Sequence, residues 1–583
     1  MKRSLLLLQA TVLAVIFTWP LVPRFFSEAI GRGDTDTPKH LWNLWWMRRE
    51  VWGGPVGLLT RFANFPDGMQ LYPIEPVNGL FAALVPVGAV PLSNGLALLH
   101  VALLGVCAGW LGWEVSGSRL GAHVASALAQ GCAFTAFTLD LGAGELRQGW
   151  WIPLGLAVLV RARRTEDRRW FGALAMVLAG AVLACFYHGL FLAMAVAIWA
   201  LATLRMRRSL VVGYALAAGI ALLVVVPIVR GFSGSYGSDT AELGGTAANA
   251  PETSGTFSVD RYPGASVSVE QLWAPAEGTR RRYDGGRYLG LVALVLGGIG
   301  VAAAPRRAGP WVAVFGVSVV LSLGPVLVWQ QAPLRVGEVV FGMPMAAVNR
   351  ALAVVGEPMN FPARFLAPAM VALSVLGALA TRWRWTVALV PLALIDIVAR
   401  DETPWPRNTF ALPDMAGLEV AGIDVAGLEV AEGGGAVADF GMTANAEPTA
   451  RTRAIAAQLL LGRPFASVPI ERLSAWSTSG DRWLRALPLV RAVNSFVGGS
   501  PLPTEGDWRS DLWLLRDRGF SHGLLTHRDS GPDFRADALL TRLCGEPVRT
   551  AHATLWAFPT IDTTPSEQRS WRNAQVDRFA SER

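Results

Sequence analysis

The chain has 583 residues, of which 52% are apolar and only 16% charged, with a formal net charge of +7. Because an ordinary soluble domain carries about 25% charged residues, this composition excludes a wholly soluble protein, a disordered chain, collagen and a coiled coil. The positive charge comes almost entirely from arginine and does not indicate a nucleic-acid partner, since arginine collects in the cytoplasmic loops of membrane proteins.

Eleven apolar runs predict an α-helical polytopic membrane protein with about eleven transmembrane helices. The runs cover residues 4–22, 94–113, 120–138, 148–161, 170–186, 189–204, 210–229, 288–304, 311–329, 364–381 and 385–399. No small-residue cleavage site closely follows the first run, which favours an uncleaved span over a removed signal peptide. The further run 77–91 is short and holds two prolines, so we place it at the membrane interface or as a re-entrant segment.

Arginine-rich connectors determine the predicted orientation. Five arginines lie between residues 161 and 169 and three between 205 and 208, whereas the short alternate connectors hold only Arg147. Connectors rich in lysine and arginine stay in the cytoplasm. We therefore predict a multi-pass protein of the cytoplasmic (inner) membrane with its N-terminus inside, provided that 77–91 does not cross.

This orientation divides the chain into two predicted domains. Residues 1–399 form a transmembrane domain, and residues 400–583 form an exterior (periplasmic) soluble domain. The large exterior connectors of the first domain are 23–93, 230–287 and 330–363. In the second domain, residues 436–440 and 522–526 look like strands, and residues 452–461 and 533–543 look helical. Such a mixture predicts a small α/β domain.

A short aromatic helix is expected in the first exterior connector. Asp36 and Thr37 stand before Pro38, and a capping residue followed by proline is typical of a helix start. Tryptophans at 42, 45, 46 and 52 lie on roughly one side of the helix that follows. Such a helix lies in the plane of the membrane surface, with its aromatic face among the lipid headgroups.

Two carboxylates of this connector, Asp34 and Asp36, have two interpretations. In the plain one, Asp36 only caps the helix and the tryptophans only anchor it. In the functional one, a carboxylate at the membrane surface acts as general base on an acceptor hydroxyl, or Asp34 and Asp36 hold a divalent cation such as Mg²⁺ or Mn²⁺. The residues alone leave both interpretations open.

Other polar residues on the predicted exterior face could bind substrate. Glu145 and Arg147 lie in a short connector, where they could equally pair with each other or face solvent. His188 stands alone between two spans, where a histidine is more often a satisfied interfacial residue than a ligand. Arg364 begins a span, so it either snorkels to the surface or binds a lipid phosphate, whose oxygens match its planar fork. The candidates are His40, Tyr72, Glu145, Arg147, His188, Glu357 and Arg364.

Several short motifs resemble those of bacterial GT-C-type polytopic membrane proteins. The motifs are Asp36 followed six residues later by Trp42 and then Trp45-Trp46, the stretch from Asn64 to Tyr72-Pro73, the turn Gly117-Ser118-Arg119, the stretch Gln148-Gly-Trp-Trp-Ile-Pro153-Leu154, and Pro362-Ala-Arg364-Phe365. Together with the C-terminal exterior α/β domain they cover nearly the whole chain.

The resemblance implies a GT-C-like fold and a glycosyltransferase (a hexosyltransferase) that works at the outer membrane face. Such proteins transfer a sugar from a polyprenyl-phosphate-linked donor, here to an unknown glycan, lipid or protein acceptor. Their usual catalytic group is an acidic residue of the first exterior loop, which implies Asp36 first and Asp34 second. Relatives often have a histidine near position 145, where this chain has Glu145.

Two other classes of function compete with the enzyme: a lipid or polysaccharide transporter, and a non-catalytic membrane assembly factor. A transporter needs ionisable residues near mid-span and broken helices in repeated halves, and the sequence has few such residues and no convincing repeat. An assembly factor would bind its partner through the exterior domain. No P-loop, GxSxG, HExxH or GxGxxG motif stands in a usable context, so soluble-type ATP, hydrolase, zinc and dinucleotide chemistry has no support.

Overall fold

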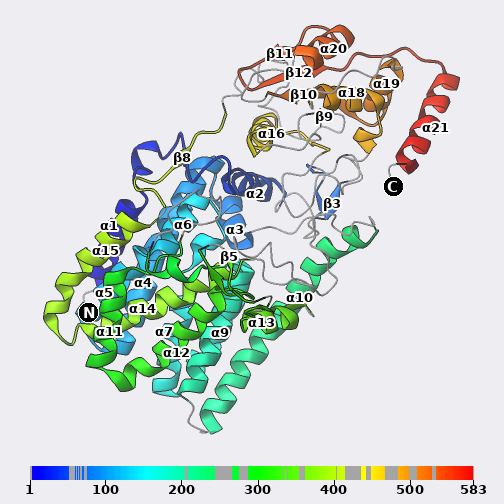
Figure 1. Cartoon of the computed structure of the whole chain (residues 1–583). Helices are drawn as coiled ribbons and strands as arrows, with labels where there is room; N and C mark the ends of the chain where they lie inside the picture. The colour runs from blue at the N-terminus through cyan, green and yellow to red at the C-terminus, as the bar shows by residue number, and fades with distance from the viewer. Residues whose placement is uncertain are drawn as a thin grey trace.

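A computed structural model gives the fold of the protein. It describes residues 3–50, 59–60, 62–63, 65, 68–70, 75–203, 208–242, 266–274, 286–330, 332–337, 339–353, 361–401, 403–413, 435–440, 448–466, 483–497, 508–527 and 534–581. Figure 1 shows a bundle of helices that contains the N-terminus and, above it, a smaller region with a sheet that contains the C-terminus.

The bundle is helical wherever the sequence has an apolar run, over most of each run. Its helices are α1 (Arg3–Phe17), α2 (Thr37–Glu50), α3 (Pro76–Leu84), α4 (Ala89–Ser116), α5 (Arg119–Gln130), α6 (Ala133–Leu141), α7 (Trp151–Thr165), α8 (Arg168–Ala184), α9 (Phe186–Ala202), α10 (Arg208–Glu242), α11 (Leu291–Ala303), α12 (Pro305–Ser322), α13 (Met345–Ala353), α14 (Leu366–Ala380) and α15 (Leu389–Arg400). Short 3₁₀ helices connect some of them: η1 (Val22–Arg24), η2 (Leu146–Gln148), η3 (Val269–Leu272), η4 (Pro362–Phe365) and η5 (Arg384–Ala388).

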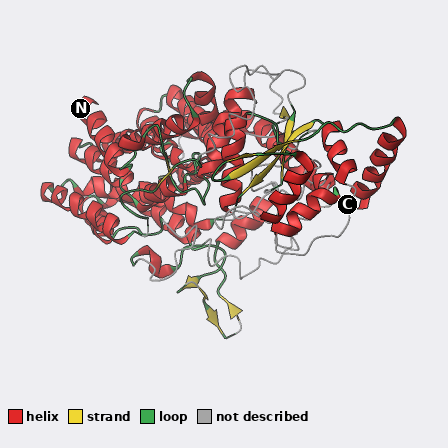
Figure 2. Ribbon diagram, turned by 90° about the horizontal axis from the view of Figure 1, so that it is seen from above, coloured by secondary structure: helices red, strands yellow, loops and turns green. Residues whose placement is uncertain are grey.

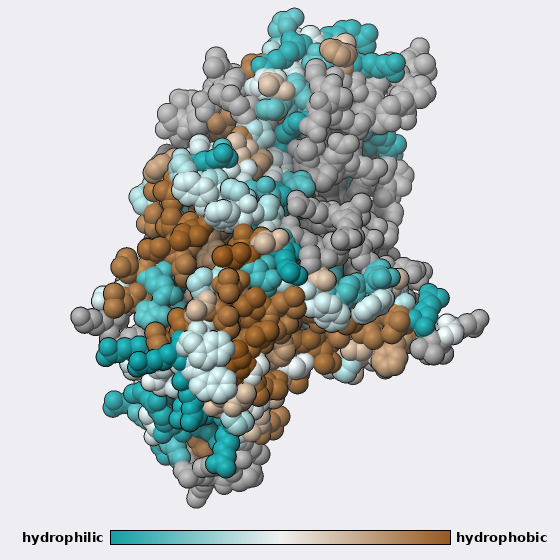
Figure 3. Space-filling view, turned by 60° about the vertical axis from the view of Figure 1, so that its left-hand side comes forward, coloured by the Kyte–Doolittle hydropathy of each residue, from teal (hydrophilic) through white to brown (hydrophobic). Residues whose placement is uncertain are grey.

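Among the described residues, four helical segments are long and apolar enough to cross a membrane: Ala89–Ser116, Arg119–Leu141, Leu210–Pro227 and Pro362–Ala380. The surface fits a membrane protein, because a brown apolar band separates two hydrophilic ends in Figure 3. Leu392 and Ile395 of α15 are among the exposed apolar side chains. The number of eleven crossings stays a prediction, since the other apolar helices are shorter.

Helix α14 lies at the centre of the bundle. All of its residues are buried, and it packs against α4, α5, α11 and α12. A small residue permits the closest of these approaches: a Cβ at Gly300 of α11 would lie 1.9 Å from the backbone oxygen of Leu376. Close approach through small residues is how membrane helices commonly associate.

Two helices differ from their predicted boundaries. Helix α10 continues to Glu242, so the start of the predicted connector 230–287 is helical; no proline follows Pro227 to interrupt it. Helix α12 ends at Ser322 instead of reaching 329, because Gly324 adopts a φ of 82° that reverses the chain. Short antiparallel pairs follow, with strands β4 (Val328–Trp329), β5 (Ala332–Pro333), β6 (Arg335–Val336) and β7 (Val339–Val340).

The run 77–91 does not form a crossing helix of its own. Helix α3 has nine residues, which at 1.5 Å per residue rise about 14 Å, less than half the thickness of the apolar core of a bilayer. Leu80 and Leu84 are exposed on one side, whereas Asn78 and Ala82 are buried on the other. This one-sided burial is what a helix at the interface requires.

The smaller region contains a four-stranded sheet in the order β11-β12-β10-β9. Strands β9 (Ala436–Asp439) and β10 (Phe520–Thr526) are parallel, and β12 (Ala553–Ala557) pairs antiparallel with β10 and with β11 (Val548–Arg549). Its helices are α16 (Pro448–Leu461), α18 (Pro488–Val497), α19 (Trp508–Asp517), α20 (Phe534–Cys544) and α21 (Pro565–Ser581). Figure 2 shows the yellow strands of the sheet with red helices beside them. The predicted strands and helices at 436–440, 522–526, 452–461 and 533–543 coincide with β9, β10, α16 and α20.

Several contacts join residues after α15 to the connector 23–93. Strand β1 (Ala29–Ile30) pairs antiparallel with β8 (Thr409–Phe410), which follows α15. Helix α16 packs against α2, where Trp42 Nε1 donates to Gln458 Oε1 at 2.8 Å and Gln458 Nε2 donates to the Phe62 carbonyl at 2.6 Å. A further short pair, β2 (Leu59–Thr60) with β3 (Met69–Gln70), lies in the same connector. These contacts fix both ends of the segment that carries Asp36.

Candidate functional site

The start of α2 is locked against the connector after α6. The Asp36 backbone N–H donates to the Leu141 carbonyl at 3.2 Å, and the Asp36 carbonyl accepts from the His40 N–H at 3.2 Å. Gly31 makes the close approach possible: its φ is +120°, and a Cβ there would lie 2.3 Å from Thr37 Oγ1. Asp36 therefore occupies the capping position of α2, at a place fixed by two separate parts of the chain.

The two aspartates of this loop have different surroundings. Asp36 Oδ1 lies 2.9 Å from Lys39 Nζ, and its side chain is only 6% exposed. Asp34 is 56% exposed, and its Oδ1 lies 3.4 Å from Nε of Arg32, whose NH1 is 3.6 Å from Asp140 Oδ2. A sheltered carboxylate that an ammonium holds in place suits a catalytic role better than an exposed one.

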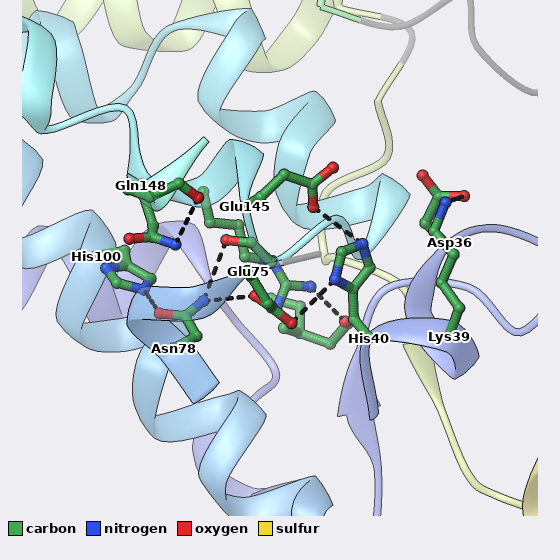
Figure 4. Close-up of polar contacts among 12 residues, drawn as sticks. Asp36, Lys39, His40, Glu75, Asn78, His100, Glu145 and Gln148 are labelled. Carbon is green, nitrogen blue, oxygen red and sulfur yellow. Dashed lines mark hydrogen bonds and ion pairs between the residues drawn. The ribbon is translucent and has the colours of Figure 1, made fainter. Parts of the chain in front are cut away.

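His40 lies between two glutamates, as Figure 4 shows. Its Nδ1 is 3.0 Å from Glu75 Oε1, and its Nε2 is 3.0 Å from Glu145 Oε2. The three residues come from α2, from the residue before α3 and from the residue before η2. The side chains of His40 and Glu75 are 2% and 1% exposed, so this histidine connects three segments from inside the protein.

The two carboxylates keep His40 positively charged. Burial opposes the charge, but Glu145 and Glu75 outweigh it and raise the pKa of His40 from 6.5 to about 10. Burial likewise acts to raise the pKa of Glu145, yet His40, with smaller contributions from Lys39 and Arg364, holds that pKa below its usual value of 4.5. Both ring nitrogens of His40 therefore carry a proton at neutral pH: Nδ1 is hydrogen-bonded to Glu75, and Nε2 forms an ion pair with Glu145.

A chain of hydrogen bonds extends from Glu75 into the bundle. Asn78 Nδ2 donates to Glu75 Oε2 at 2.6 Å, and Asn78 Oδ1 lies 2.8 Å from His100 Nε2. Trp150 Nε1 donates to His100 Nδ1 at 3.1 Å. Because one ring nitrogen of His100 accepts and the other donates, this ring is neutral. The space beside Glu75 is tight, since a Cβ at Gly144 would lie 2.0 Å from Glu75 Oε2.

Arg147 and His188 hold the connector in place. Arg147 neither pairs with Glu145 nor faces solvent: it is buried, and its NH2 donates to the Ile30 carbonyl at 2.8 Å and to the Leu139 carbonyl at 3.4 Å. His188 is fully buried, and its Nε2 lies 3.1 Å from the Leu146 carbonyl. Both side chains thus bind backbone oxygens around the Glu145 turn.

Arg364 is a buried cation near the same turn. Its guanidinium carbon lies 4.5 Å from the ring centre of Tyr187 and 4.6 Å from that of Phe361, and the residue is 9% exposed. Its positive charge contributes to the low pKa of Glu145. No carboxylate in the described part of the chain forms an ion pair with it. A buried arginine without a paired anion suits an incoming phosphate.

The tryptophans of α2 face protein instead of lipid headgroups, so that prediction is wrong. Trp42 and Trp46 are 0% and 1% exposed, and their rings stack with centres 5.8 Å apart. They form one cluster with Phe62 and with Ile455 of α16. The smaller region covers the aromatic face of α2. A contact between segments that are distant in the sequence cannot be predicted from the residue pattern of one helix.

Two residues that the sequence suggested are not described by the structure, and other residues that the structure brings together were missed. Tyr72 and Glu357 lie outside the described residues. Lys39, Asn78 and His100 were not considered as site residues. The spacing of Lys39 three residues after Asp36, one helical turn, is the signal that could have identified the first of them.

The aspartates do not fit the divalent cation that the sequence suggested. Asp36 already contacts an ammonium, and Asp34 is paired with Arg32. In the described part of the chain, no three His, Cys, Asp or Glu side chains gather as ligands for a metal ion. An ammonium 2.9 Å from Asp36 would also repel a dication at that carboxylate. We therefore derive no catalytic step through a metal ion.

Comparison with known proteins finds similarity among solved structures. No protein-family model matches the chain, and no curated protein matches it. Two solved structures of the arabinofuranosyltransferase AftD from Mycobacteria, both of a single-residue variant, are similar with a TM-score of 0.50 and 16% identity. The match covers 96% of this chain and 42% of the AftD chain, so the protein spans less than half the length of that enzyme. The likeness shows that nearly the whole chain shares a fold with part of AftD.

Proposed function

We propose that the protein is a membrane glycosyltransferase that moves a sugar from a polyprenyl-phosphate donor to an acceptor on the outer face of the cytoplasmic membrane. The observation that carries the proposal is that Asp36 and Arg364 both lie against the turn around Glu145. The Asp36 N–H donates to the Leu141 carbonyl before this turn, and Arg364 stacks on Tyr187, whose neighbour His188 contacts the Leu146 carbonyl after it. Asp36, which could take a proton, and Arg364, which could bind a phosphate, thus lie near the turn around Glu145. The shared fold with an arabinofuranosyltransferase supports the same class of reaction.

The proposed reaction is a single displacement. The acceptor hydroxyl oxygen forms a bond to the anomeric carbon of the sugar while its proton passes to Asp36 Oδ2, the oxygen opposite the one nearest Lys39. The bond between the anomeric carbon and the phosphate oxygen breaks, and its electron pair stays on the phosphate. Arg364 offsets the negative charge that develops there. The products are the glycosylated acceptor and a polyprenyl phosphate.

The remaining candidates receive supporting roles. His40 and Glu145 position α2 against the connector, and Arg147 and His188 position the connector itself. Asp34 is the second choice for the base. For Tyr72 and Glu357 we retain substrate binding, and for residues 400–583 we retain an exterior soluble α/β domain. The predicted orientation, with the N-terminus inside, places all of these groups on the outer face.

Cells that lack the protein provide the test. We compare their glycan and glycolipid profile after complementation with wild type, Asp36→Asn or Asp34→Asn at matched membrane levels. Asp36→Asn should lower the restored species about 100-fold or more, the usual contribution of a general base, whereas Asp34→Asn should restore most of it. The thermal unfolding of each purified variant checks that its fold is retained.

Two results would contradict the assignment. If Asp36→Asn restores the profile as wild type does, Asp36 is only a helix cap. If the profile of cells without the protein equals that of wild-type cells under every growth condition tested, no glycosyl transfer depends on it. In Arg364→Met, the loss should be accompanied by accumulation of the unused polyprenyl-phosphate-linked donor, because the transfer step itself is impaired.

A further inference from the structure

The surroundings of Asp36 contain a cation of the protein's own. Lys39 lies one helical turn after Asp36 on α2, with its Nζ 2.9 Å from Asp36 Oδ1 and its side chain 15% exposed. The chain has only two lysines, Lys2 and Lys39, whereas its arginines are many. Figure 4 shows the Asp36–Lys39 pair at one end of the buried network that contains His40.

We propose that the Lys39 ammonium serves as the fixed positive charge of this site, in the position that a divalent cation would otherwise take beside Asp36. The proposal rests on the function proposed above and makes Lys39 a positioning residue for the general base. It also states that the protein transfers its sugar without a bound divalent cation at the Asp34–Asp36 loop.

Asp36 and, at longer range, Glu145 are among the groups that the ammonium affects. Lys39 Nζ lies 2.9 Å from Oδ1 of Asp36, and we assign Oδ2 of the same carboxylate to the acceptor hydroxyl. The charge of Lys39 also reaches Glu145, where it adds to the effects of His40 and Arg364.

A metal ion at the same carboxylate would have to displace this arrangement. Mg²⁺ and Mn²⁺ bind carboxylate oxygens at close range, and Asp36 Oδ1 already has the lysine as neighbour. A dication at Asp36 would stand close to a like charge that α2 fixes in place. Asp34 offers little compensation, because it is exposed and paired with Arg32.

The first experiment measures metal binding directly. Mn²⁺ is titrated into the purified full chain in detergent, and the free ion is quantified by its paramagnetic resonance signal. We expect the bound Mn²⁺ to be the same in wild type and in the Asp34→Asn/Asp36→Asn double variant. Binding of one Mn²⁺ per chain that the double variant loses would overturn the proposal, whereas binding that survives lies elsewhere and supports it.

The second experiment tests the charge of residue 39 in the complementation assay. Lys39→Met removes the charge and nearly keeps the length, and we expect about 100-fold less restored product, as for other losses of catalytic positioning. Lys39→Arg keeps the charge and should restore product to within about 10-fold of wild type. Arg48→Met, at the far end of α2 where Arg48 NH1 donates to the Val87 carbonyl, is the control for losing one cation from this helix.

The outcomes separate this proposal from the proposed function. Equal product from Lys39→Met and wild type would overturn the role of Lys39 while Asp36→Asn still tests the enzyme. Equal loss in Lys39→Met and Lys39→Arg, with unchanged thermal unfolding, would also overturn it, because the charge would then not be the property that matters. If cells without the protein show no missing glycan, the function fails and the Mn²⁺ titration alone decides the metal question.

Discussion

Replacing His40 with glutamine should weaken the folded protein in a pH-dependent manner. The substitution removes the positive charge between Glu75 and Glu145, and both carboxylates lose a partner at 3.0 Å. Breaking a buried ion pair from one side costs about 3–5 kcal/mol, because the remaining charge stays buried without compensation. The rise in the pKa of His40 from 6.5 to about 10 corresponds to about 5 kcal/mol, at about 1.4 kcal/mol per pH unit.

The direction of the pH dependence follows from the raised pKa. In the wild type, the contribution of His40 is fully present below pH 6.5, where the unfolded chain also carries this proton, and it is lost as the pH rises through about 10. His40→Gln has no such contribution at any pH. The difference in unfolding temperature between the two proteins should therefore be largest near pH 6 and should disappear near pH 10.

Tryptophan fluorescence during heating, in one detergent from pH 6 to pH 10, measures this difference. His552→Gln is the matched control, since no carboxylate of the described residues pairs with His552. The reasoning is refuted if His40→Gln unfolds within one degree of wild type at pH 6, or if the two curves keep a constant separation up to pH 10. Either result would mean that the two glutamates do not depend on the charge of His40.

Two further substitutions test the packing around the site. Gly144→Ala would place a Cβ 2.0 Å from Glu75 Oε2. We expect overpacking to lower the free energy of unfolding by about 1–3 kcal/mol, measured by thermal unfolding. The control is Gly172→Ala on α8, where a Cβ meets nothing within 4 Å, and it should be neutral or stabilising by up to about 1 kcal/mol. Gln458→Leu would leave the buried Trp42 Nε1 without its acceptor, at about 1–3 kcal/mol, while the Phe62 carbonyl would keep the Phe465 N–H as a donor. Limited proteolysis should then cut near α16 faster than in wild type, and an unchanged cleavage rate would show that α16 does not depend on this contact.

The sequence predicted elements whose causes are local. Apolar runs became helices because a run of that length has to satisfy its own backbone hydrogen bonds in a membrane. The stretches at 436–440 and 522–526 became β9 and β10 because short apolar segments next to helices pair readily. Where a single residue decides a boundary, as Gly324 does at the end of α12, the prediction missed by several residues.

The candidate site was predictable in its members but not in its arrangement. Asp36, His40, Glu145 and Arg364 were all named from the sequence. Nothing in their spacing shows that His40 contacts both Glu75, 35 residues away, and Glu145, or that Arg147 binds backbone oxygens instead of Glu145. Such contacts arise from packing between distant segments, and the same cause buried the tryptophans of α2 under α16.

The pairing of β1 with β8 has a consequence for biogenesis. Thr409, in β8, follows Glu28 by 381 residues and binds its carboxylate, and β8 comes directly after the last helix of the bundle. At about 5–20 residues per second, a ribosome needs roughly 20–75 seconds to make that length of chain. The segment that contains β1 therefore emerges long before the strand that pairs with it. Asp36 reaches its final setting only after every membrane segment has been inserted, so a nascent or truncated chain would carry an unfinished site.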